Sequence, residues 1–155
     1  MNKIFLYFLI LCICSCVKDG TTTSYLILKN STLHSIDIRP YKMGIEDTSK
    51  LIHLASNTEN QIELNRTRGK STAPLVFFDY FKNVDSVIIT WDNLYPVTHM
   101  ISDNFISSNK NIAVLAQRNI GYRKSYSESV LSENKQSISW NVVYNFNEQD
   151  YLDAK

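Results

Sequence analysis

Residues 138–147, which read ISWNVVYNFN, decide the fold class of this chain. Side chains along a β-strand alternate between the two faces of a sheet, so apolar residues at every second position share one face. The segment keeps this alternation over its whole length. In a helix, residues at every second position would not share one face. The segment therefore predicts a half-buried strand. Its alternating apolar side chains are Ile138, Trp140, Val142, Tyr144 and Phe146.

Outward from this strand, short strand-like segments are separated by turn residues at a spacing of roughly ten residues. Residues 75–81 and 87–91 are nearly continuous apolar runs, which predicts core strands covered on both faces. Pro40 is expected to end the strand that begins at Ile36. Residues 132–135 are predicted to close a hairpin with the last strand. The remaining predicted strands are 24–29, 51–54, 61–64 and 126–131.

This pattern predicts an all-β fold, a single antiparallel β-sandwich of about seven or eight strands in the immunoglobulin or transthyretin style. A closed barrel is the alternative. Helix is expected only as a turn or two within residues 111–120 and as a short C-terminal helix with Asn147 as its N-cap.

The N-terminus has the form of a secretory signal, with Lys3 followed by an apolar run that is short for a membrane span. Ile13-Cys14-Ser15-Cys16 resembles a lipobox, with an apolar residue at −3, a small one at −1, and then the cysteine that receives the lipid. We therefore expect cleavage before Cys16 and lipidation of that residue. An uncleaved signal anchor is the alternative.

Three segments are expected in this chain: a lipoprotein signal peptide over residues 1–15, the lipidated Cys16 with a polar tether over 16–23, and a β-sandwich domain over 24–155. Removal of residues 1–15 takes one basic residue from 16 and leaves 15 acidic and 15 basic side chains. This balance argues against a nucleic-acid partner, which would call for a basic face. All three cysteines lie in the signal or at its junction, so neither a disulfide nor a cysteine metal site is expected in the domain.

No set of residues predicts catalysis or a cofactor. His34, His53 and His99 are isolated from one another and form no metal-ligand motif. Asp79 is an unusual acid among aromatic residues, but a position facing solvent or a hydrogen bond at a strand end explains it better than a raised pKa for acid catalysis. We therefore expect no enzyme and no catalytic, cofactor-binding or metal-binding residues.

Aromatic and basic residues offer the candidate binding surfaces. Tyr41, Tyr95 and Tyr122 lie near predicted turns, where exposed tyrosines could contact a glycan or a protein. Trp140 and Tyr144 are instead expected to pack in the sandwich. The basic loop formed by Arg66, Arg68 and Lys70 is interpreted as a solvated hairpin tip.

Residues 84–92 read VDSVIITWD, and residues 144–151 read YNFNEQDY. These segments resemble the VDSVxIxFDD segment and the YTFTEEDY ending of small lipoproteins of the Bacteroides type. Trp91, Asn93 and Gly121 depart from the family pattern. The resemblance implies a small β-rich lipoprotein and carries no activity. Asp85-Ser86-Val87 also fits the pattern that such bacteria O-glycosylate, although a position within a strand would hide Ser86.

Residues 17–20, VKDG, resemble the short charged export signal by which these lipoproteins reach the outer face of the outer membrane. The expected function is therefore that of a surface lipoprotein, a non-catalytic binding module that engages a glycan or a protein and is held at the outer membrane by its lipid. The alternative is a structural or assembly accessory that faces the periplasm.

Overall fold

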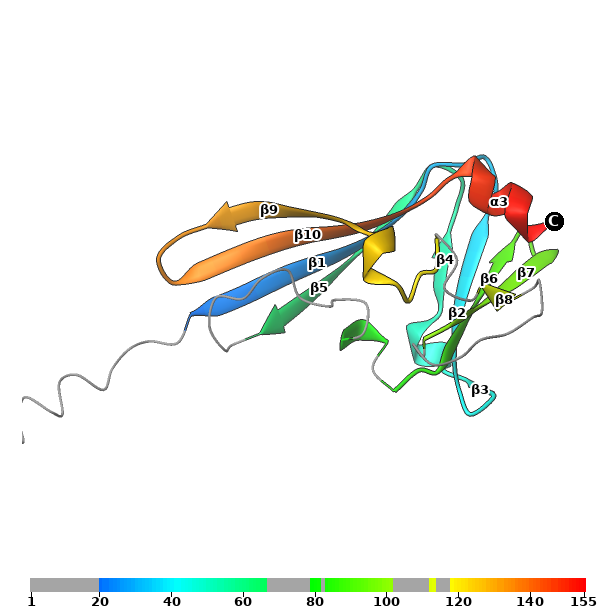
Figure 1. The fold of residues 1–155 in the computed structure, drawn as a ribbon, viewed down its shortest axis with the longest axis horizontal. Helices are drawn as coiled ribbons and strands as arrows, with labels where there is room; N and C mark the ends of the chain where they lie inside the picture. Colours follow the sequence, from blue (N-terminus) through cyan, green and yellow to red (C-terminus); the bar gives the residue numbers. More distant parts are fainter. Residues whose placement is uncertain (1–19, 67–78, 82, 102–111, 114–117) are drawn as a thin grey trace, which may run out of the picture.

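The computed structural model describes residues 20–66, 79–81, 83–101, 112–113 and 118–155. Strands in these residues form a four-stranded and a six-stranded sheet, and a short helix follows the last strand (Figure 1). The fold is a β-sandwich with a short C-terminal helix, as the sequence predicts. Eight of its strands have three or more residues, in agreement with the predicted seven or eight. The described strands do not close into a barrel.

The four-stranded sheet, called the long sheet below, is centred on its two longest strands. β1 (Thr21–Asn30) and β10 (Ser137–Phe146) pair in parallel over their whole length. β5 (Glu59–Arg66) pairs antiparallel with β1, and β9 (Ser127–Glu133) pairs antiparallel with β10. The parallel central pair departs from the predicted antiparallel sandwich. It is possible because the chain between β1 and β10 is long enough to provide the crossover that parallel neighbours require.

The six-stranded sheet is built around β2, which pairs antiparallel with β3, β4 and β6. β6 pairs antiparallel with β7, and β7 pairs in parallel with β8. Two short 3-10 helices, η1 (Thr48–Lys50) and η2 (Arg123–Ser125), lie in connections. The strands of this sheet are β2 (Ile36–Lys42), β3 (Ile45–Glu46), β4 (Ile52–Leu54), β6 (Ser86–Trp91), β7 (Tyr95–Met100) and β8 (Ile112–Ala113).

The core lies between the two sheets and follows the alternation of each strand. Leu26 and Leu28 of β1 are fully buried against residues of the second sheet such as Ile36 and Ile38. Aromatic rings join the sheets, since Trp91 of β6 packs edge-to-face on Phe146 of β10 with ring centroids 5.9 Å apart. The predicted packing roles of Tyr144 and Trp140 hold, because Tyr144 is buried in the core and Trp140 is partly buried against it.

The two ends of the long sheet are different. At the end where the chain enters β1, the Thr21 N–H donates to the Gln136 carbonyl in the β9–β10 turn (2.8 Å). We call this the tether end. At the other end β1 leads into loop 31–35 and β10 leads into helix α3 (Glu148–Ala154) (Figure 1). We call this the distal end. Ten extended residues separate the two ends by roughly 30 Å.

Two boundaries differ from those predicted. β1 begins at Thr21, inside the segment expected as a tether, and Thr22 is already buried. β2 continues through Pro40 to Lys42 instead of ending at the proline. Pro40 is tolerated because β4 pairs with residues 36–38 of β2 and β3 with residues 41–42, so the proline lies between these two ladders, where no donor is needed.

The two apolar runs predicted as fully covered strands also turn out differently. In the run 75–81, Asp79 and Tyr80 are helical and Phe81 is buried, while residues 75–78 lie outside the described part. The run 87–91 does form β6, but only every second side chain of it is buried, and Ile88 is partly exposed on the other face. The apolar composition of residues 87–91 therefore does not mean that both faces of this strand are buried.

The predictions for the last third of the chain are mixed. The hairpin is confirmed, with β9 and β10 joined through Asn134, whose side chain accepts from the N–H groups of Gln136 and Ser137. The C-terminal helix is confirmed with Asn147 as its N-cap. The helical turn predicted within residues 111–120 is wrong at Ile112–Ala113, which is strand β8, because its pairing to β7 overrides the local pattern.

Candidate functional site

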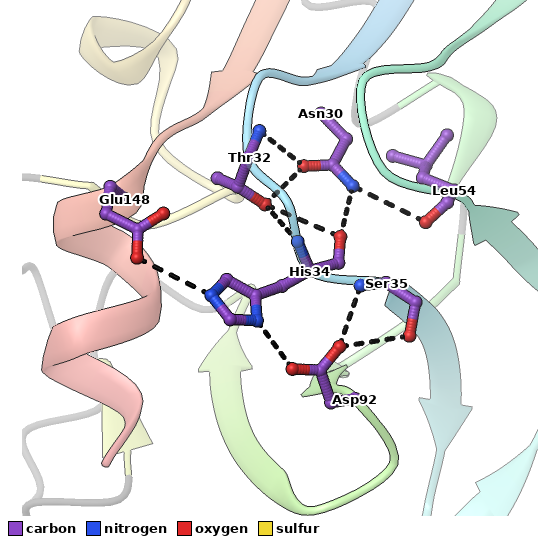
Figure 2. Close-up of polar contacts among 7 residues, drawn as sticks. All are labelled: Asn30, Thr32, His34, Ser35, Leu54, Asp92 and Glu148. Atoms are coloured by element: carbon purple, nitrogen blue, oxygen red, sulfur yellow. Dashed lines mark hydrogen bonds and ion pairs between the residues drawn. The ribbon is translucent and has the colours of Figure 1, made fainter.

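The distal end carries a cluster of polar and aromatic side chains centred on His34 (Figure 2). The His34 ring lies between two carboxylates: its Nδ1 is 2.6 Å from Oδ2 of Asp92, and its Nε2 is 3.5 Å from Oε1 of Glu148. The ring also stacks on Tyr151, with centroids 3.5 Å apart and planes 14° from parallel. His34 thereby joins loop 31–35, the β6–β7 turn and helix α3.

Asp92 is placed by the tight turn between β6 and β7. Asp92 and Asn93 both have positive φ, 49° and 58°, a conformation that Asp and Asn adopt more readily than most residues. The Asp92 carboxylate accepts from the N–H of Ser35 (2.9 Å) and from its hydroxyl (3.3 Å). The hydrogen bond from the Ser35 N–H, followed by that from His34, lowers the pKa of Asp92. The carboxylate is therefore ionised and accepts the Nδ1 proton of His34.

Loop 31–35 is held by the buried side chain of Asn30. Its Nδ2 donates to the carbonyls of His34 (2.7 Å) and Ala55 (2.9 Å). Its Oδ1 accepts from the N–H and the hydroxyl of Thr32 (Figure 2). An asparagine that folds back on its own loop in this way fixes the backbone conformation. These hydrogen bonds therefore hold the loop that presents His34 in one conformation.

Helix α3 is fixed at its first turn. Asn147 and Asp150 form a reciprocal capping box, in which each side chain accepts from the other's backbone N–H. Asp150 also makes a two-pronged ion pair with Arg118 at 2.9 and 3.0 Å. These contacts direct Tyr151 toward His34 and bring Lys155 Nζ to 4.5 Å from the Tyr151 ring centroid, a cation–π contact.

The polar contacts of this cluster join three segments of the chain. Both ring nitrogens of His34 face carboxylates, and the Ser35 hydroxyl donates to Asp92 and not to the imidazole. A nucleophile–base pair would need the hydroxyl on the imidazole. Across the described residues, no three His, Cys, Asp or Glu side chains are grouped so that they could hold a metal ion.

Three exposed leucines lie on the same three segments as this cluster. Leu33 precedes His34, Leu94 follows the Asp92–Asn93 turn, and Leu152 lies one helical turn after Glu148 on the same side of α3. Their side chains are 81%, 69% and 54% exposed. We call the cluster with these three leucines the distal patch. It presents apolar side chains from three separate segments on a rigid support.

The other two histidines lie elsewhere. His53 is exposed on β4 and pairs with Asp37 of β2 (Nδ1 to Oδ1, 2.7 Å). His99 is buried on β7, where its Nδ1 accepts from the N–H of Ile120 (3.1 Å). Burial lowers the pKa of His99 to about 4, so it is a neutral acceptor inside the fold.

The remaining residues singled out from the sequence are dispersed. Tyr41, Tyr95 and Tyr122, expected to be exposed, are each partly buried, and Tyr95 belongs to the surroundings of the distal patch through its edge contact with Tyr151. Ser86 is partly buried and donates to Asp85. Cys16, Arg68 and Lys70 lie outside the described residues, and Arg66 is the last residue of β5.

Sequence reasoning missed the His34–Asp92 pair because 58 positions separate the two residues. The dipeptide Asp92-Asn93 after an apolar run was a usable turn signal, but nothing in the sequence places that turn beside residue 34. No family model, curated protein or solved structure matches this chain. No helix in the described part is both long and apolar enough for a membrane crossing.

Proposed function

We propose that this chain is a lipid-anchored, non-catalytic binding module that holds its distal patch away from the membrane. The observation that carries the proposal is the separation of the two ends of the long sheet. The chain enters at Thr21, at the tether end, whereas the distal patch lies at the far end of β1 and β10. A lipid on Cys16 would therefore leave the distal patch pointing outward.

The exposed leucines of the distal patch and the fixed segments that carry them favour a role in binding. Large exposed apolar side chains that cluster on one part of a surface are typical of interaction sites. The Asn30 contacts, the Asp92 turn and the capping box of α3 hold the supporting segments in place. Such preorganisation lowers the entropy lost on binding. Leucines favour an apolar protein surface over a glycan, so a protein is the ligand we propose first.

Cysteine labelling distinguishes surface display from the alternative, a periplasm-facing accessory. The sequence after Cys16 has no cysteine, so Leu94→Cys places a single thiol in the distal patch of the acylated protein. We expect a membrane-impermeant maleimide to label this variant on intact cells. Labelling only after the outer membrane is permeabilised would support the periplasmic accessory instead. Ile89→Cys is the control, because Ile89 is buried in β6 and should stay unlabelled in both cases.

Site-specific photocrosslinking tests binding by the distal patch. A photoreactive residue at Leu33 should yield a discrete adduct with another protein on intact cells. The same residue at Lys135, in the turn at the tether end, is the matched control and should yield none. Adducts at both positions, or at neither, would contradict binding through the distal patch.

A further inference from the structure

Two tyrosine rings at the distal end share one cation, the ammonium of Lys155. The Nζ of Lys155 lies over both rings, 4.5 Å from the ring centroid of Tyr151 and 5.6 Å from that of Tyr95. The two rings are nearly perpendicular, with 80° between their planes and 5.9 Å between their centroids. A cation within about 6 Å of a ring centroid is attracted by the negative face of the ring. The two tyrosines therefore form adjoining walls of a site for a cation, called the tyrosine pair below.

The tyrosine pair is built from two segments that are far apart in the sequence. Tyr151 and Lys155 are four positions apart at the end of α3, a spacing at which the side chains of a helix commonly meet. Tyr95 belongs instead to β7, which lies against α3 (Figure 1). Local helix geometry therefore explains one wall of the site, and only the tertiary fold explains the other.

The walls of this site are fixed, whereas the cation in it can be replaced. Tyr151 is buried, and its ring stacks on His34 and meets the ring of Trp91 edge-to-face. Tyr95 is held by its pairing with Trp91 in the ladder between β6 and β7. Lys155 is exposed, so its side chain can leave the two rings without opening the core. The tyrosine pair is therefore preorganised for a cation from another source.

The surroundings of the tyrosine pair favour a positive charge. The hydrogen bond to the side chain of Tyr151 and, more weakly, the nearby carboxylate of Glu148 raise the pKa of Lys155. Helix α3 itself contains three acidic residues and no basic one. The site therefore suits an ammonium group better than a neutral group of the same size.

Exposed leucines of the distal patch adjoin the tyrosine pair in the sequence. Leu94 comes directly before Tyr95, and Leu152 comes directly after Tyr151. A ligand that contacts the rings and these leucines carries a cationic group beside apolar ones. A lysine within an apolar protein segment fits this description, and the chain's own Lys155 shows that a lysine side chain fits the site.

We propose that the tyrosine pair binds a lysine side chain of the protein partner, in exchange for Lys155. This inference rests on the proposed function, because it names the chemistry of the partner that the distal patch binds. The partner's ammonium lies over the two rings, and the apolar side chains beside it contact Leu94 and Leu152. Lys155 occupies the rings in the free protein and so competes with the partner.

Peptide titration tests this inference on the full-length protein purified from membranes in detergent. The probe is the peptide acetyl-Leu-Lys-Leu-amide. The matched neutral probe has norleucine in place of the lysine, which keeps the apolar stem and lacks the ammonium. Shifts of the tyrosine ring signals in nuclear magnetic resonance spectra report binding.

The variant Lys155→Ala removes the competing ammonium and leaves both rings in place. We expect the lysine peptide to bind this variant about fivefold or more tightly than it binds the wild type, and about fivefold or more tightly than the norleucine peptide does. Adding Tyr95→Leu removes one wall and should abolish most of this gain. Circular dichroism shows whether the variants are folded.

Lys124 and Tyr122 provide a matched control elsewhere on the surface. The Nζ of Lys124 lies 5.8 Å from the ring centroid of Tyr122, a similar contact made with one ring. Lys124→Ala should therefore leave the affinity for the lysine peptide unchanged. Equal binding of the lysine and norleucine peptides to Lys155→Ala would overturn the inference. An equal gain in Lys124→Ala, or a gain that survives Tyr95→Leu, would overturn it as well.

Sedimentation of the wild type tests the remaining occupant, a second copy of this chain. A dimer that Lys155→Ala abolishes would show that Lys155 of another copy fills the site and would also overturn the inference. The crosslinking at Leu33 does not depend on the charge of the partner. An adduct there without a preference for the lysine peptide would overturn this inference and leave the proposed function standing.

Discussion

The two halves of the β1–β10 pair meet different surroundings. Toward the distal end, the inward side chains of β1 are Leu26 and Leu28, which belong to the core between the sheets. Toward the tether end they are Thr22 and Ser24, which are also buried but polar, and Ile138 of β10 is buried there outside that core. The main-chain ladder runs unbroken through both halves.

This difference separates two contributions to the stability of a sheet that usually occur together: main-chain pairing and the burial of apolar side chains. Main-chain pairing sets the register of the strands along the whole long sheet, while the fully buried apolar side chains of β1 that belong to the core, Leu26 and Leu28, lie in the distal half. Since burial of apolar surface supplies most of the stability, the distal half should be the last part to open. A rigid distal end is also what a binding surface held away from a membrane requires.

The largest expected effect compares an aromatic residue from each half. Phe146→Ala should lower the free energy of unfolding by about 4 kcal/mol, because Phe146 is buried against Trp91 and Tyr144 in the core. Trp140→Ala in the tether half should cost clearly less, since Trp140 is only partly buried. Chemical denaturation of both variants measures the difference. Equal losses would remove the distinction between the halves.

The next effect is a pH dependence of stability that comes from His99, which is buried on β7. The pKa of His99 is about 4 in the fold against an ordinary value of 6.5, so the unfolded chain takes up the proton first as the pH falls. The free energy of unfolding should therefore decrease from pH 6.5 downward, by about 3 kcal/mol once the pH has passed below 4. Denaturation at a series of pH values checks this, and His99→Gln should remove that part of the dependence. His53→Gln is the control and should leave it intact, because His53 is exposed.

A smaller effect is expected at the cap of α3. Asn147→Ala removes the side chain that accepts the Asp150 N–H and should cost about 1 kcal/mol. Because α3 carries Tyr151 and Glu148 to His34, the loss should appear as faster amide exchange in α3 and loop 31–35. Asn145→Ala, an exposed position on β10 whose Oδ1 accepts from the Ser31 hydroxyl, should change exchange in α3 very little. Faster exchange in α3 in both variants would contradict the role of the cap.

The smallest effect has the opposite sign. The buried Ser24 hydroxyl has no hydrogen-bond partner among the described residues. Ser24→Ala should therefore raise the free energy of unfolding, by up to about 1 kcal/mol, since an unsatisfied buried hydroxyl is costly. Thr22→Val should not stabilise the protein, because Thr22 does have a partner. Thermal denaturation of both variants decides this, and a destabilised Ser24→Ala would show that its hydroxyl is satisfied.

The fold class could be predicted because local patterns decide it. The alternation in residues 138–147 gave β10, the turn at Asn134 gave the hairpin, and Asn147 before an acidic first turn gave the cap of α3. Errors arose where pairing between distant segments overrides local preference. Pro40 lies within β2 because two different strands flank it, and Ile112 lies in β8 because β7 is beside it.

The distal patch could not be predicted for a related reason. The parallel pairing of β1 with β10 brings loop 31–35 beside helix α3, and the pairing of β2 with β6 brings the turn at Asp92 beside the same loop. No local signal reveals either pairing. His34 therefore appeared as an isolated histidine. The exposed leucines gave no sequence signal either, because leucine is the residue expected inside a core.

Mass spectrometry of the protein recovered from membranes tests the central claim, that the tether end is held by a lipid on Cys16. We predict an N-terminal fragment that begins at Cys16 and carries a diacylglyceryl group, and we predict that Cys16→Ser loses both this modification and membrane retention. An unmodified chain that retains residues 1–15, or one cut at another position, would contradict the account.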